Sequence, residues 1–86
     1  MGWVSNMITP DEAEVLATTA VQQYIKSCEC NGRQDIANVL MKLVSVCGIG
    51  MTAMVGRDDA AARLIGTANY IVKTQPEKPW NMGTLQ

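Results

Sequence analysis

The segment between Ile36 and Val55 constrains the fold more than any other part of the sequence. The segment contains only four polar side chains, those of Asn38, Lys42, Ser45 and Thr52. On an α-helix these four fall within one stripe about 80° wide, and the rest of the circumference is apolar. A helix that is apolar on nearly all sides must be covered on nearly all sides. The sequence therefore predicts a central helix that needs several neighbours.

A second helix precedes this segment. Thr9 is suited to cap the free N–H groups of a helix start, Pro10 fits the first helical position, and Glu12 completes a capping box. The following residues alternate between an apolar and a polar face with helical spacing. Because Asn-Gly at positions 31 and 32 favours a helix end, we predict a helix over residues 10–31.

The third predicted helix follows Gly56, where two aspartates suit the positive end of a helix dipole. Gly56 is the only residue at this point that clearly disfavours a helix. The alternative interpretation is therefore that the second and third helices form one bent helix. Pro76 and Pro79 end helical structure. The predicted organisation is an N-terminal arm (1–8), a helical domain (9–75, with helices over 10–31, 34–55 and 58–74) and an extended C-terminal tail (76–86).

These elements predict an all-α fold, a small helical hairpin or three-helix bundle with extended N- and C-terminal arms. Two amphipathic flanking helices cover about half of the central helix. The remaining apolar patch, several hundred Å² in area, is larger than soluble monomers usually expose. We expect homo-oligomerisation to complete the fold, as a dimer or a higher oligomer around a symmetry axis. A different protein or lipid would be the alternative cover.

We assign the oligomer interface to apolar positions of the central helix. Gly48 within this helix also suggests a close approach of another backbone or a local kink, since glycine lowers helix propensity by about 1 kcal/mol relative to alanine. The predicted interface residues are Met41, Val44, Gly48, Met51 and Val55.

Lipid is a weaker candidate for covering the central helix, although the segment is long enough to span a bilayer. Lys42 lies about one third of the way along it, where insertion costs about 3 kcal/mol. The N-terminus also lacks the basic and apolar regions of a secretory signal. Together with an odd number of cysteines, this favours a cytoplasmic protein and makes a small membrane protein the third hypothesis.

Charge and residue content argue against several function classes. The net charge is −1 and the seven basic residues are scattered, which disfavours nucleic-acid binding. The chain has no histidine, so we expect neither a catalytic triad nor a four-ligand zinc site built on Cys28, Cys30 and Cys47. We predict a protein that is not an enzyme, with no catalytic residues, no metal and no cofactor.

A few polar and aromatic residues are candidates for binding. Tyr70 falls opposite the apolar stripe of the third helix, where an outward aromatic beside cations can anchor a partner or stack on a ligand. Each candidate also has a simple alternative, in which the side chain only covers its own helix or extends into solvent. The predicted binding residues are Tyr70, Arg63, Lys42 and Lys26.

The sequence thus favours a non-catalytic protein-interaction module, a self-associating helical adaptor or inhibitor that also contacts another protein. The alternative is an oligomer that sequesters a small anionic ligand, such as a nucleotide, in a cavity between its subunits.

Overall fold

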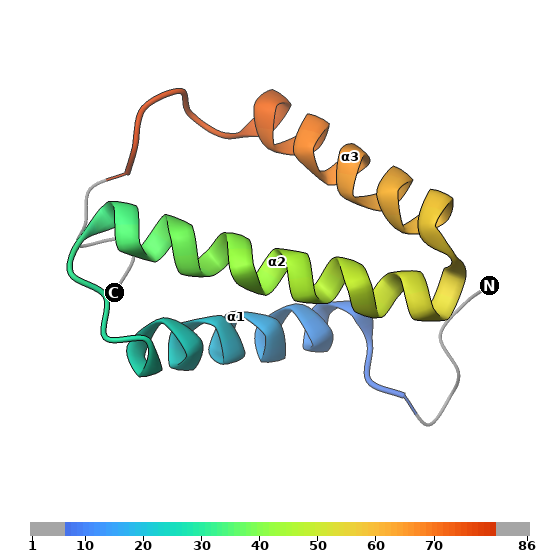
Figure 1. The fold of residues 1–86 in the computed structure, drawn as a ribbon, viewed down its shortest axis with the longest axis horizontal. Coiled ribbons are helices and arrows are strands. Elements are labelled where there is room, and N and C mark those ends of the chain that lie inside the picture. Colours follow the sequence, from blue (N-terminus) through green and yellow to red (C-terminus); the bar gives the residue numbers. More distant parts are fainter. Residues whose placement is uncertain (1–6, 81–86) are drawn as a thin grey trace.

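A computed structural model of the chain describes residues 7–80, which form three α-helices (Figure 1). They are α1 (Pro10–Ser27), α2 (Arg33–Val55) and α3 (Arg57–Thr74). The helices lie side by side, with α2 between α1 and α3. The predicted all-α, three-helix fold is confirmed. Of the predicted arms, residues 1–6 and 81–86 lie outside the described part of the chain.

The start of α1 has the predicted capping box. The backbone N–H of Glu12 donates to Thr9 Oγ1 at 3.1 Å, and the backbone N–H of Thr9 donates to Glu12 Oε1 at 2.8 Å. The bond from the Thr9 backbone lowers the pKa of the Glu12 carboxyl group below its usual value, because it favours the charged form. Two otherwise unpaired helix donors are thereby satisfied.

The end of α1 differs from the prediction, since the helix ends at Ser27 and not at position 31. Glu29 adopts a left-handed conformation with φ of 53°, which stops the helix before the Asn-Gly pair is reached. The backbone N–H of Asn31 donates to Asp35 Oδ2 at 2.9 Å and so belongs to the start of α2. The Asn-Gly pair therefore precedes the second helix and does not end the first.

Gly56 separates α2 from α3, so the second and third helices are not one bent helix. Its φ of 89° and ψ of 160° lie in a region that is almost confined to glycine. Because the connection is a single residue, α3 begins at Arg57 and folds back along α2 (Figure 1).

The contact between α2 and α3 is close near this turn. A Cβ atom built on Gly48 would lie only 3.1 Å from Leu64 Cδ1, so the missing side chain admits Leu64. Ala60, in the first turns of α3, is only 2% exposed. The neighbour at Gly48 is thus a side chain of the same chain, whereas the sequence pattern predicts another backbone or a kink there. Farther along, α3 diverges from α2 (Figure 1).

The isolated chain has very little core. Among residues 7–80, Ala60 is the only residue classed as buried, and thirteen others are half-buried. The whole chain exposes 7492 Å², about half as much again as the roughly 5,000 Å² of a compact monomer of this mass. The half-buried residues are Ala13, Val21, Tyr24, Ile25, Cys28, Cys30, Ile36, Val39, Leu40, Leu43, Gly48, Met51 and Leu64.

Candidate interaction surfaces

The predicted interface on α2 is divided by the packing of α3. Gly48 faces Leu64 of the same chain, and Met51 is half-buried. Met41 is 60% exposed, and Val44 and Val55 are also exposed. Since these five positions share one stripe of the helix, α3 occupies the middle of it and leaves its ends free. Their role in an oligomer remains a prediction.

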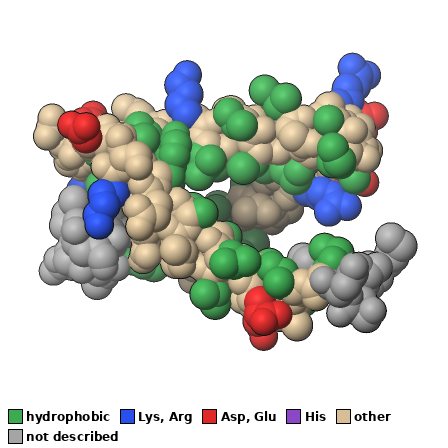
Figure 2. Space-filling model, turned by 90° about the horizontal axis from the view of Figure 1, so that it is seen from below, with side chains coloured by type: hydrophobic (Ala, Val, Ile, Leu, Met, Phe, Trp, Pro, Cys, Tyr) green, Lys and Arg blue, Asp and Glu red, His purple; other side chains and the backbone are tan. Residues whose placement is uncertain are grey.

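Apolar side chains are exposed on all three helices and not only on α2. Figure 2 shows hydrophobic side chains along the surface of the helices and beside the open space between them. Met54 of α2 is 82% exposed, and on α3 Ile65 is 61% and Val72 is 83% exposed. Exposed apolar area of this extent, distributed over several elements, is typical of surfaces that contact another macromolecule.

An open groove of about 1100 Å³ lies between α1 and the first half of α2. Its floor is apolar, while Glu14 lies on its α1 side and Lys26 and Arg33 bring positive charge. Trp80 also lines the groove, and the Arg33 guanidinium donates to the Trp80 carbonyl oxygen at 2.7 Å. This bond joins the start of the C-terminal tail to the start of α2. The apolar lining residues are Ala17, Val21, Ile25, Ile36, Ala37, Leu40 and Pro79.

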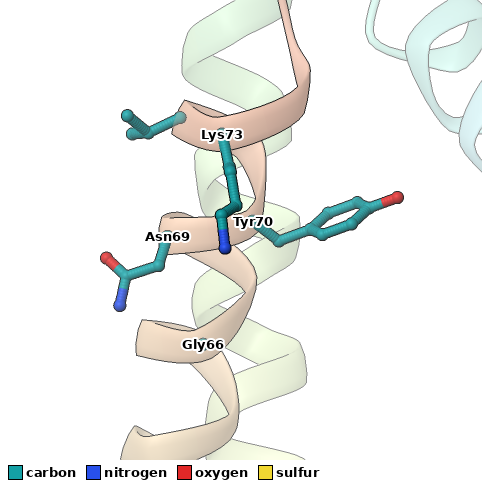
Figure 3. A pocket seen from close by; sticks show the side chains of 5 residues that line it. Gly66, Asn69, Tyr70 and Lys73 are labelled. Atoms are coloured by element: carbon teal, nitrogen blue, oxygen red, sulfur yellow. The ribbon is translucent and has the colours of Figure 1, made fainter.

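Tyr70 lies on the outer surface of α3, beside a shallow hollow of about 520 Å³ that Gly66, Asn69 and Lys73 also line. Figure 3 shows Tyr70 and Asn69 extending in different directions from the helix, with Lys73 between them. The hollow is formed by one helix face, and its polar groups do not converge on a common point. It offers an aromatic ring and a cation to a partner, but it does not enclose a ligand.

The four predicted binding residues do not form one site. Arg63 Nε donates to Asp59 Oδ1 at 2.7 Å within α3, so its charge is already paired. Lys42 is exposed on α2, Lys26 lines the groove, and Tyr70 lines the hollow on α3. The sequence analysis did not identify Arg33 as a groove residue, because its contact with the tail joins positions that are 47 apart in the chain.

A cluster of Tyr24, Cys28 and Cys30 lies where α1 meets α2. The Tyr24 hydroxyl donates to the Val39 carbonyl oxygen at 2.7 Å. Partial burial, and then the neighbouring Cys28, raise the pKa of the Tyr24 hydroxyl, while burial raises the pKa of the Cys30 thiol. A raised thiol pKa lowers the thiolate fraction and hence reactivity. Cys28, Cys30 and Cys47 are free thiols.

Two further properties bear on function. Within residues 7–80, no three His, Cys, Asp or Glu side chains lie together in a way that could hold a metal ion. In the same part of the chain, α2 is the one helix whose length and composition would allow it to cross a bilayer. Apolar core helices of soluble proteins can have the same length and composition. In this chain, however, none of the apolar segment of α2 is buried.

Comparison with protein-family models finds no match for this sequence, and comparisons with curated proteins and with solved structures find none either.

Proposed function

We propose that this chain is a non-catalytic interaction module that associates with further copies of itself and presents the resulting surface to another protein. The observation that carries the proposal is the near absence of a core among the described residues, of which Ala60 alone is buried. The apolar residues that would supply a core are present in the sequence but remain accessible.

Folding free energy explains why such a chain requires a partner. Ordering the backbone costs about 1–2 kcal/mol per residue, which is offset mainly by apolar burial at about 25 cal/mol per Å². A chain that leaves side chains such as Met41, Ile65 and Val72 accessible gains little from that second contribution. Association covers the same side chains and links folding to binding.

Exposed residues of α2 and α3 are the proposed contact surface. Met41 and Val44 lie on α2 outside the close contact at Gly48, and Val55 lies at the end of the same helix. The outer face of α3 adds Ile65 and Val72. Such a surface, apolar with scattered charges at its edge, has the composition of the central part of a protein interface.

Sedimentation velocity and native mass spectrometry of the purified full chain test this proposal. We expect a dimer or higher oligomer at micromolar concentration, with a melting temperature that rises with protein concentration. A strictly monomeric chain that is cooperatively folded at all concentrations would refute self-association.

Sequestration of a small anionic ligand is the second candidate. It is favoured by Lys26 and Arg33 in the groove and by Tyr70 with Lys73 on α3. A thermal-shift screen with nucleotides and inorganic anions tests it. A rise in melting temperature that saturates with ligand concentration would support this function, whereas no response to any anion would contradict it.

We place the proposed module in the cytoplasm, with a small membrane protein as the third candidate because of the length and composition of α2. Partition of the expressed protein distinguishes the two. Recovery in the soluble fraction without detergent supports the cytoplasmic assignment, and recovery only from detergent-extracted membranes supports the third candidate.

A further inference from the structure

One exposed side of α3, opposite Tyr70, carries a ridge of four apolar residues, which we call the α3 ridge. Their spacing of four, three and four positions places them within a sector about 60° wide on the helix. All four are exposed, and Ile65 and Val72 are the two large side chains. The ridge residues are Ala61, Ile65, Ala68 and Val72.

The α3 ridge is distinct from the side of α3 that packs within the chain. Ala60 and Leu64 form that inner side, since Ala60 is buried and Leu64 meets Gly48. On the helix, the centre of the ridge lies roughly 90° from this inner side. The ridge is therefore available to a second molecule while α2 and α3 remain packed together.

We propose that two copies of this chain associate by pairing their α3 helices in antiparallel orientation through the α3 ridge. This inference rests on the proposed self-association and identifies the contact that produces it. The partner is a second copy, because the side-chain sizes and the charges along the ridge are each self-complementary.

Size complementarity follows from a two-fold axis placed between Gly66 and Thr67. An antiparallel partner then sets Ala61 opposite Val72 of the other copy, and Ile65 opposite Ala68 of the other copy. The interface then contains four pairs, each of one large and one small side chain, so the two ridges are complementary in shape. Alanines seven positions apart also let the two backbones approach closely.

Charge complementarity supports the same orientation. Asp58 lies beside one end of the ridge, with its side chain 96% exposed and its Oδ1 3.4 Å from Arg57 Nε, and Lys73 lies toward the other end. The two-fold axis brings Asp58 of one copy near Lys73 of the other, and it does so twice. A parallel pair would instead set Asp58 against Asp58, which repels.

The dimensions are suited to a dimer contact. The ridge runs from Ala61 to Val72 within the 18 residues of α3 and is therefore about 17 Å long. A standard interface buries about 800 Å² per partner, and the chain exposes 7492 Å² where a compact monomer would expose roughly 5,000 Å².

Sedimentation velocity on the full chain tests the ridge directly. We expect Ile65→Glu to raise the dimer Kd at least 100-fold, because it places a charge opposite Ala68 of the partner. Met54→Glu is the matched control, since Met54 is a still more exposed apolar residue that lies on α2. Circular dichroism at high concentration verifies that both variants remain helical.

A charge exchange tests the orientation. At low ionic strength we expect Asp58→Lys or Lys73→Glu to raise the Kd roughly tenfold, and the double variant to restore it to within about threefold. An equimolar mixture of the two single variants, one of them ¹⁵N-labelled, should give mainly the heterodimer by native mass spectrometry, because both cross-pairs are then attractive. Asp11→Lys, a first-turn change on α1, controls for the effect on a helix dipole.

The outcomes separate this inference from the proposed function. A wild-type chain that is monomeric overturns both. An oligomer that withstands Ile65→Glu but dissociates with Met54→Glu overturns the ridge pairing and leaves self-association standing. An oligomer that dissociates with Ile65→Glu, yet shows no preference for the heterodimer, refutes the antiparallel arrangement.

Discussion

The two helix junctions of this molecule are built differently. Between α2 and α3 the connection is one residue, Gly56, and the helices meet where Gly48 and Ala60 carry little or no side chain. Between α1 and α2 the connection is longer, and the contact includes a directed hydrogen bond from Tyr24 to the Val39 carbonyl. The α2–α3 junction is close-packed over a short length, and the α1–α2 junction leaves an open groove.

The difference shows how side-chain size decides helix spacing. Small residues let two helices approach until a neighbour such as Leu64 fills the space, whereas at the other junction the larger Tyr24 side chain extends from α1 to the Val39 carbonyl of α2. Stability at the α2–α3 junction therefore depends on packing. At the α1–α2 junction, half-buried apolar side chains such as Val21 and Leu40 are joined by a directed polar contact.

The largest effect on stability is expected at the α2–α3 junction, from replacing Ala60 with a larger residue. Ala60→Leu should lower the free energy of unfolding by about 3 kcal/mol, because a buried position at a close contact cannot accept three more carbon atoms without displacing α3. Ala62→Leu, at an exposed position on the same helix, is the control and should change stability little. Urea unfolding at one fixed protein concentration provides the measurement. Equal effects of the two changes would show that Ala60 is not confined.

The two connecting glycines allow a matched test of the junctions themselves. Gly56 and Gly32, with φ of 89° and 115°, both hold conformations that favour glycine. We expect Gly56→Ala to cost about 2 kcal/mol and Gly32→Ala about 1 kcal/mol, because the longer connection can readjust. Thermal unfolding of both variants at equal concentration checks the order. A larger loss at Gly32 would reverse our ranking of the two junctions.

Most of the fold was predictable because its signals are local. The capping box at Thr9 and the apolar pattern between Ile36 and Val55 depend on residues within one or two helical turns, so they are readable without tertiary contacts. The end of α1 was misplaced because Asn-Gly is also suited to precede a helix. Sequence pattern alone does not show which of the two helices such a pair belongs to.

The candidate sites were less predictable because they depend on distant pairings. The sequence indicated Tyr70 and Lys26 as outward residues, but it did not show that they would lie on separate surfaces. The role of Gly48 was identified only in part, since its close approach could have been to another copy and is made to Leu64 of the same chain. The contact of Arg33 with the tail has no local signal.

A smaller effect on stability is expected at the α1–α2 junction, from removing its hydrogen bond. Tyr24→Phe removes the hydroxyl that donates to the Val39 carbonyl and should lower the free energy of unfolding by about 1 kcal/mol. Hydrogen exchange should increase in α1 and remain unchanged at the α2–α3 turn. Tyr70→Phe, on the outer surface of α3, is the control. Equal loss of protection in all three helices would show that the two junctions unfold as one unit.

The smallest effect is expected from pH and concerns the start of α1, which belongs to neither junction. The Glu12 carboxyl group has a lowered pKa in the folded chain, so its stabilising contribution is present above the unfolded value of 4.5 and is lost as the pH falls through the folded pKa. In Glu12→Gln the side-chain oxygen still accepts a hydrogen bond but carries no charge. Helicity of this variant, followed by circular dichroism from about pH 6 to about pH 3, should fall less steeply than that of the unmodified chain. Glu14→Gln should retain the original slope, because Glu14 takes no part in the cap. If both variants flatten the profile equally, the charge effect belongs to α1 as a whole and not to its capping box.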